Sequence, residues 1–176
     1  MRFRGTLILL AVCIAFGGYL YFYEIKGGEQ REKAKQEENR LWKVDASSIQ
    51  EINLTFPDRQ IASVRSGDKG WKITAPRPLE ADSGELDRLA SSAADMSRES
   101  VIEQKAADLA RFGLNPAQVT LEFKTKDGKE HKIRLGSANP TGSSTYATLE
   151  GSNEVFVVAN SVASTFNKKL DDLRNR

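Results

Sequence analysis

The stretch VTLEFKTKDGKEHKIRL, residues 119–135, decides the fold of this chain. On both sides of a central Asp127-Gly128 pair, apolar or weakly polar side chains recur at every second position. This alternation is typical of a half-buried strand, and Asp-Gly between two such runs favours a tight hairpin turn. The sequence therefore predicts an antiparallel hairpin here.

Strand-like segments with turn residues between them occur on either side of this hairpin. Residues 49–56, 60–65 and 71–74 precede it, and residues 145–149 and 154–159 follow it. Strands joined as hairpins pair antiparallel, and such sheets commonly bury one face. We expect an α+β domain made of antiparallel sheet, one or more, with helices packed on one face.

Helical spacing occurs in two main places. Asp82 and Glu85 fit a capping box, in which the aspartate accepts a free backbone N–H and Glu85 reaches back to the N-cap. Leu86 and later apolar residues up to Met96 then recur on one helix face. A last helix, capped by Asn160, is expected to run through Leu173.

Two halves of the chain share this order of elements. Residues 49–96 read as strands followed by a capped helix, and residues 119–173 read the same way. Such a repeat of pattern arises either from duplication or from the ordinary order of an α+β domain, and both interpretations stay open.

Residues 6–23, TLILLAVCIAFGGYLYFY, carry no charged side chain. As a helix rising about 1.5 Å per residue, they would span roughly 27 Å, close to the thickness of a bilayer core. Arg2 and Arg4 precede the run, and Glu24 is the first charge after it. By the positive-inside rule we expect a single-pass transmembrane anchor, with residues 1–5 as a cytoplasmic tail and everything after the anchor extracytoplasmic.

Three other interpretations of this apolar run stay open. A cleaved signal peptide needs small residues at its cleavage site, and Ala15-Phe16-Gly17 fits poorly. Leu10-Ala11-Val12-Cys13 resembles a lipoprotein lipobox, but valine before the cysteine disfavours it. A buried core helix is disfavoured because arginines precede the run and a polar segment follows it.

Residues 24–44 are almost all polar and form a charged linker or stalk. Gly27-Gly28 interrupts the apolar helix, and oppositely charged residues three or four apart then favour a solvated helix. Residues 45–176 show the alternating pattern and are expected to form the folded extracytoplasmic domain.

Composition excludes several classes of protein. The formal net charge of +2 over 176 residues is too small to argue for nucleic-acid binding, for which a clustered basic face is expected. The single cysteine, Cys13, lies in the apolar run, so the chain forms no intrachain disulfide and has no cysteine cluster for zinc.

Chemistry-bearing residues are sparse in the sequence. His131 is the single histidine, and a lone strand histidine is usually a boundary residue. Residues 136–142 could cradle an anion through backbone N–H groups, although a connecting loop is the simpler interpretation. Trp42 and Trp71 could stack on a sugar, although Trp71 in an alternating strand favours the core.

One acidic cluster could be read as a metal or acid–base site, but helix capping and the helix dipole account for it more simply. Its members are Glu80, Asp82, Glu85 and Asp87. We therefore expect no catalytic, cofactor-binding or metal-ligating residue, no cofactor, and no enzymatic activity.

Several short motifs together resemble a known family. They are Gly70-Trp71-Lys72-Ile73-Thr74-Ala75-Pro76, then Ala81-Asp82 before a helix, Asp108 to Pro116 (DLARFGLNP), Leu135-Gly136, Gly142, Tyr146-Ala147 and Val155 to Val158. In order and spacing they resemble the bacterial family called domain of unknown function 4340, over roughly residues 45–174. The gap between Leu114 and Pro116 is shorter than in that family's pattern.

The resemblance implies an anchored domain outside the bacterial inner membrane, without established catalytic residues. Members of the family are often encoded beside subunits of ABC transporters like those associated with gliding motility. We therefore expect a membrane-anchored accessory or scaffold subunit whose partner is a membrane protein such as an ABC transporter permease-like subunit. The alternative is an extracytoplasmic binding module for an envelope glycan or lipid.

Overall fold

The computed structural model describes residues 12–19, 37–67 and 70–175. The chain divides into two compact units, residues 1–39 and 40–176. Of the predicted anchor, residues 12–19 are helical, and the rest of 6–23 lies outside the described residues, as does most of the linker. No helix within the described ranges is long and apolar enough to cross a membrane.

The folded unit begins at Arg40, ahead of the boundary expected at Asp45. The reason is Trp42, which the sequence pattern assigns to the linker. Its side chain is buried, its indole Nε1 donates to the carbonyl oxygen of Ala93 at 2.6 Å, and its ring meets Phe123 edge-on at 5.0 Å. The last residues of the expected linker therefore belong to the core.

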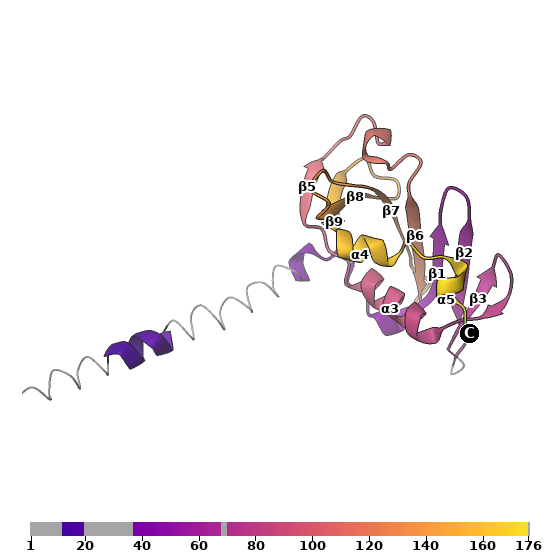
Figure 1. Cartoon of the computed structure of the whole chain (residues 1–176), viewed down its shortest axis with the longest axis horizontal. Helices are drawn as coiled ribbons and strands as arrows, with labels where there is room; N and C mark the ends of the chain where they lie inside the picture. The colour runs from indigo at the N-terminus through magenta and orange to yellow at the C-terminus, as the bar shows by residue number, and fades with distance from the viewer. Residues whose placement is uncertain (1–11, 20–36, 68–69, 176) are drawn as a thin grey trace, which may run out of the picture. The chain divides into compact units, whose positions relative to one another are not determined.

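A single antiparallel sheet of nine strands forms the centre of this unit (Figure 1). The strand order is β4-β3-β2-β1-β6-β7-β8-β9-β5. The strands are β1 (Ile49–Thr55), β2 (Gln60–Arg65), β3 (Trp71–Ala75), β4 (Leu79–Glu80), β5 (Ser100–Glu103), β6 (Val119–Thr125), β7 (Glu130–Ala138), β8 (Ser144–Leu149) and β9 (Val155–Ala159). The predicted antiparallel sheet is thus confirmed.

The hairpin predicted from residues 119–135 is β6–β7, the centre of that sheet. Its register pairs Val119 with Leu135, Leu121 with Ile133 and Phe123 with His131. Because side chains alternate between the faces of a strand, all six lie on one face. This face is the buried one, since Leu121, Phe123 and Ile133 have almost no exposed surface.

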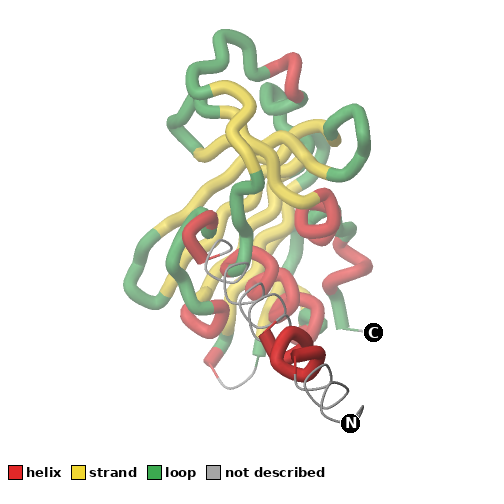
Figure 2. The backbone as a smooth tube through the Cα atoms, turned by 90° about the vertical axis from the view of Figure 1, so that its left-hand side faces the viewer, coloured by secondary structure: helices red, strands yellow, loops and turns green. Residues whose placement is uncertain are grey.

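Few helices accompany the sheet, and they pack on its apolar face (Figure 2). They are the 3-10 turn η2 (Ala46–Ser48) and the helices α3 (Ser83–Ala94), α4 (Asn160–Thr165) and α5 (Leu170–Leu173). α3 contributes Leu86, Leu89, Ala90, Ala93 and Ala94 to the core. Another 3-10 turn, η4 (Ala110–Phe112), lies in the long β5–β6 connection.

The N-terminus of α3 confirms half of the predicted capping box. An Asp82 carboxylate oxygen accepts from the backbone N–H groups of Gly84 and Glu85 at 3.0 and 3.2 Å. Glu85 does not reach back, because the N–H of Asp82 donates instead to the carbonyl oxygen of Leu173. The Glu85 carboxylate pairs with Arg88 and Lys168.

The predicted last helix is wrong in its continuity. It is two short helices, α4 and α5, with Phe166 to Lys169 between them. Asn160 does not cap it; Ala159 occupies the N-cap position, and the Asn160 side-chain oxygen accepts from the Thr145 hydroxyl at 2.8 Å. The apolar face itself is retained, because Phe166 and Leu173 are fully buried.

The two strand runs leave the centre of the sheet in opposite directions. From the β1–β6 pair, β1 to β4 step outward on one side and β6 to β9 on the other. β1 to β4 are followed by α3 and β6 to β9 by α4, and both helices contribute to one hydrophobic core.

Candidate functional site

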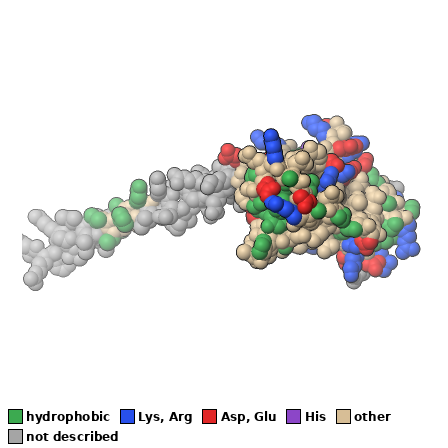
Figure 3. Space-filling view, turned by 90° about the horizontal axis from the view of Figure 1, so that it is seen from above, with side chains coloured by type: hydrophobic (Ala, Val, Ile, Leu, Met, Phe, Trp, Pro, Cys, Tyr) green, Lys and Arg blue, Asp and Glu red, His purple; other side chains and the backbone are tan. Residues whose placement is uncertain are grey.

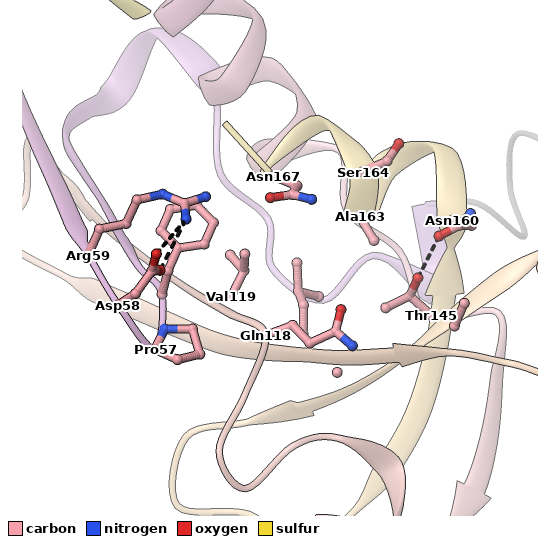
Figure 4. Close-up of a pocket in the computed structure, with 14 residues that line it drawn as sticks. Pro57, Asp58, Arg59, Gln118, Val119, Thr145, Asn160, Ala163, Ser164 and Asn167 are labelled. Atoms are coloured by element: carbon pink, nitrogen blue, oxygen red, sulfur yellow. Dashed lines mark hydrogen bonds and ion pairs between the residues drawn. The ribbon is translucent and has the colours of Figure 1, made fainter. Parts of the chain in front are cut away.

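A cavity of about 380 Å³ opens at one end of the sheet, beside α4 (Figure 4). The β1–β2 turn, the first residues of β6, the end of β7, the start of β8 and α4 all contribute to its walls. These segments are far apart in sequence and meet here because β1, β6, β7 and β8 are neighbours in the sheet. The volume is at the small end of the range for small-molecule pockets, roughly 300–1,000 Å³.

The apolar part of the lining belongs to the main core. Val119, Leu135 and Ala163 line the cavity and are otherwise buried. They come from β6, β7 and α4, which fixes them in place by packing. A small apolar group of a ligand would therefore find a rigid surface here.

The polar part of the lining consists mainly of amides and hydroxyls. Figure 4 shows Gln118 and Asn167 on opposite sides of Val119, and both side chains are exposed. The Gln118 amide has one long hydrogen bond, 3.4 Å to the Ser137 hydroxyl. Within the described part of the chain, the Asn167 side chain has no hydrogen-bond partner. Both amides are thus available to a ligand.

One ion pair lies at the end of the cavity opposite Asn160. Arg59 Nη1 is 3.0 and 3.3 Å from the two carboxylate oxygens of Asp58, and Nη2 donates to the carbonyl oxygen of Lys168 at 3.4 Å. The guanidinium also covers the Phe56 ring at 3.9 Å. The charge of this arginine is therefore paired with Asp58, although its Nε is buried without a hydrogen-bond partner among the described residues, and its guanidinium covers the face of Phe56.

The sheet has one open edge, at β5. Its outer side has no strand neighbour within the described residues, and its inner side pairs with β9. Val101 and Ile102 on β5 are 42% and 45% exposed, and they are the exposed large hydrophobic side chains of residues 40–67 and 70–175. An edge strand of this kind offers backbone donors and acceptors to another strand.

The opposite edge, β4, is covered by the C-terminal segment. Ala81 and Arg174 form an antiparallel bridge, and the N–H of Asn175 donates to the carbonyl oxygen of Glu80 at 2.9 Å. Of the two edges, only the β5 side is left unpaired by the described part of the chain.

A family model described as domain of unknown function (DUF4340) matches residues 71–176, more than half of the chain. The chain belongs to this family. The DUF4340 match begins at Trp71, so residues 45–70, which the sequence resemblance also covered, lie outside it. No curated protein and no solved structure matches the chain.

The DUF4340 motif residues identified in the sequence lie at packing positions. Gly70 lies against Ser83, whose hydroxyl accepts from the N–H of Trp71 at 3.0 Å. Gly113 has φ 68° and ends η4 in the left-handed conformation. Gly136 lies against the backbone of Phe112 and Gly113.

His131 lies on the core side of β7 and not in the cavity. Its ring stacks on Phe123 at 4.9 Å and approaches Trp42 at 5.5 Å. Its Nε2 is buried and has no hydrogen-bond partner among the described residues. Desolvation lowers the pKa of His131 below 6.5, which favours the neutral ring.

The acidic cluster singled out in the sequence serves the fold. Besides the Asp82 cap and the Glu85 ion pairs, one carboxylate oxygen of Asp87 accepts from Trp71 Nε1 and from Arg65 Nη2, each at 2.8 Å. Glu80 lies 3.8 Å from Lys72. Within the described ranges, no group of three histidine, cysteine or acidic side chains is placed to hold a metal ion.

The other sequence candidates are also accounted for by packing. Trp42 and Trp71 are both buried. In the 136–142 loop, the side-chain oxygen of Asn139 accepts from the N–H of Ser144 and the hydroxyl of Thr141, so the loop binds its own donors. The cavity residues Arg59, Gln118 and Asn167 carried no local sequence signal, because no motif joins them.

Proposed function

We propose that this chain is a non-enzymatic, membrane-anchored accessory subunit that binds a membrane protein partner at the open edge of β5. The observation that carries the proposal is the difference between the two sheet edges. The C-terminal segment covers β4, whereas β5 presents unpaired backbone together with Val101 and Ile102. Proteins usually protect such an edge unless another chain pairs with it.

β5 lies next to the first residues of the folded unit. Arg40 forms an antiparallel bridge with Ser97, and the N–H of Leu41 donates to the carbonyl oxygen of Met96 at 3.0 Å. β5 begins at Ser100, directly after this contact. If residues 6–23 cross the bilayer as proposed, the folded unit is held at the membrane, where an ABC transporter permease-like subunit would be within reach.

Charge distribution agrees with a protein partner more than with nucleic acid. On the face seen in Figure 3, Lys and Arg side chains are interspersed with Asp and Glu side chains. Ion pairs of opposite sign cross the polar face of the sheet, such as Lys124–Glu130 and Arg134–Glu150. This surface offers no clustered positive potential for a phosphate backbone.

The proposal is tested by affinity purification of the full chain from native membranes, followed by cross-linking and identification of the captured protein. We expect one membrane protein to be captured, with cross-links near residues 98–105. Ile102→Asp and Val101→Asp should abolish the capture, because a charge on the edge opposes strand addition. Thr55→Asp, at an exposed strand position on the polar face, is the matched control and should retain the partner.

Retention of the same partner by both β5 variants would refute the edge as its binding site. Rescue of a deletion strain by Ile102→Asp at native abundance would also contradict the proposed function.

A second function, binding of an envelope glycan or lipid, is supported by a different observation. The cavity beside α4 combines an apolar floor with exposed amides that are free for a ligand. Concave sites with a few convergent polar groups are the usual form of small-molecule sites.

A further inference from the structure

We propose that the cavity beside α4 binds a neutral N-acetylated sugar, with the acetamido group held between Gln118 and Asn167. The inference rests on the second function above and names its ligand class. It is independent of the β5 edge, which lies at the end of the strand order and is separated from β7 by β8 and β9.

Charge excludes an anionic ligand. Asp58 and Arg59 are the charged side chains of the lining, and they neutralise each other at 3.0 Å. The remaining polar lining consists of amides and hydroxyls. A phosphate or carboxylate would meet the Asp58 carboxylate beside Arg59, the one cationic side chain of the lining, and would lose its hydration. The ligand is therefore uncharged.

The two carboxamides match an acetamido group. Each side-chain amide has a donor and an acceptor, so the pair can bind both the N–H and the C=O of a ligand amide. The methyl of the acetamido group then lies on the apolar floor formed by Val119, Leu135 and Ala163. A hexose without an acetamido group lacks both this amide and this methyl, so the apolar floor would stay exposed to water.

Hydroxyl partners for the sugar ring lie along α4 and β8. Asn160 and Thr145, hydrogen-bonded to each other, line the end of the cavity away from Arg59 (Figure 4). Ser164 also lines the cavity, and its hydroxyl donates to the carbonyl oxygen of Ser161 at 3.0 Å. A volume of about 380 Å³ suits a mono- or disaccharide and is short of a long acyl chain. Since the lining is mixed rather than apolar, a sugar fits it better than a lipid tail.

The test uses the full chain in detergent and saturation-transfer NMR observed on the ligand. The probes are N-acetylglucosamine and its β-1,4-linked dimer, with glucose and cellobiose as matched sugars that lack the acetamido group. We expect signals from both acetylated sugars, strongest at the acetamido methyl, and no comparable signal from glucose or cellobiose. Gln118→Ala and Asn167→Ala should each weaken binding about tenfold, the loss expected for one hydrogen bond.

Two controls separate this inference from the others. Asn53→Ala removes an amide on the opposite face of the sheet and should leave binding unchanged. Ile102→Asp, which tests the β5 edge, should also leave it unchanged, so the two proposals fail independently. Absence of binding, equal binding of glucose and N-acetylglucosamine, or full binding by both cavity variants would overturn the inference.

Discussion

Gly113 and Gly136 pack backbone against backbone. A Cβ atom on Gly136 would lie 2.3 Å from the carbonyl oxygen of Phe112 and 3.0 Å from the carbonyl carbon of Gly113. A Cβ atom on Gly113 would lie 2.9 Å from the backbone nitrogen of Ser137. Two motifs of the family sequence thus meet where the β5–β6 connection lies on β7.

Gly136→Ala should destabilise the domain by about 1–3 kcal/mol, because backbone atoms cannot move aside as a flexible side chain would. Urea unfolding followed by tryptophan fluorescence measures this. Gly84→Ala is the matched control: its Cβ would meet only a side-chain oxygen of Asp82 at 3.3 Å, and we expect little change. Equal stability of both variants would show that the two backbones separate readily.

Asp87→Ala should cost about 1–3 kcal/mol, because it leaves the indole N–H of the buried Trp71 without its acceptor. The same oxygen also holds Arg65, which lies over the Trp71 ring at 4.6 Å. The free energy of unfolding in urea checks this value. Arg88→Ala removes an exposed ion pair on the same helix and should change stability by less than about 0.5 kcal/mol. An equal loss of unfolding free energy in the two variants would contradict a role for Asp87 in holding α3.

The free energy of unfolding should fall as the pH drops from 6.5 toward the lowered pKa of His131. Since the pKa of His131 is lowered in the folded state by desolvation, the unfolded chain takes up the proton first. The contribution is therefore complete above 6.5, the ordinary value, and is lost as pH falls toward the folded pKa. Melting temperature measured across this range should drop for the native chain and stay flatter for His131→Phe.

Asp127 affects stability at lower pH than His131 does. Hydrogen bonds from Thr125 and then Lys129 lower the pKa of Asp127 to about 2, so its contribution is present above 3.8 and lost as pH falls toward 2. The contribution of Asp127 changes only below 3.8, whereas that of His131 begins to fall at 6.5. An unchanged pH dependence of the melting temperature in His131→Phe near neutrality would refute the assignment to His131.

Phe166→Ala should destabilise the domain by about 3–5 kcal/mol, because this fully buried ring fixes the junction between α4 and α5 to the core. Leu170→Ala should cost less, since Leu170 is only half-buried. Thermal and urea unfolding measure the loss of stability in each variant. If Leu170→Ala were the more damaging, α5 rather than the junction would hold the C-terminal segment.

Replacing residues 1–23 with a cleavable signal peptide should abolish the cellular role, because a tethered subunit acts through its high effective concentration beside the partner. Complementation of a deletion strain at matched abundance measures this. The control keeps residues 1–23 and carries His131→Ala, which should complement. Full rescue by the soluble form would favour a free binding protein.

The sequence predicted the central hairpin because alternation and the Asp-Gly turn act locally. The Asp82 cap was predictable for the same reason, since its partners lie two and three residues away. The failure of Glu85 to complete the capping box was not predictable. The N–H of Asp82 donates instead to the carbonyl oxygen of Leu173, ninety-one positions later in the chain. The break after α4 likewise depends on tertiary packing of Phe166.

The cavity was beyond prediction for a stronger reason. Arg59, Gln118 and Asn167 lie in separate parts of the chain, and their proximity depends on the strand order and on where α4 packs. A single sequence reveals neither the order β1-β6-β7-β8 nor the register between those strands.

The covered β4 edge limits how many chains this sheet can recruit. A sheet open at both ends can add copies indefinitely and grow into a fibre, as head-to-tail contacts do when they fail to close. Here the C-terminal segment terminates one end through the Ala81–Arg174 bridge. Among the described residues, β5 is therefore the one edge left for strand addition, so the proposed edge pairing would add a single strand partner. Removing residues 174–176 would expose the β4 edge as well. A domain with two unpaired sheet edges could then assemble edge to edge into polymers.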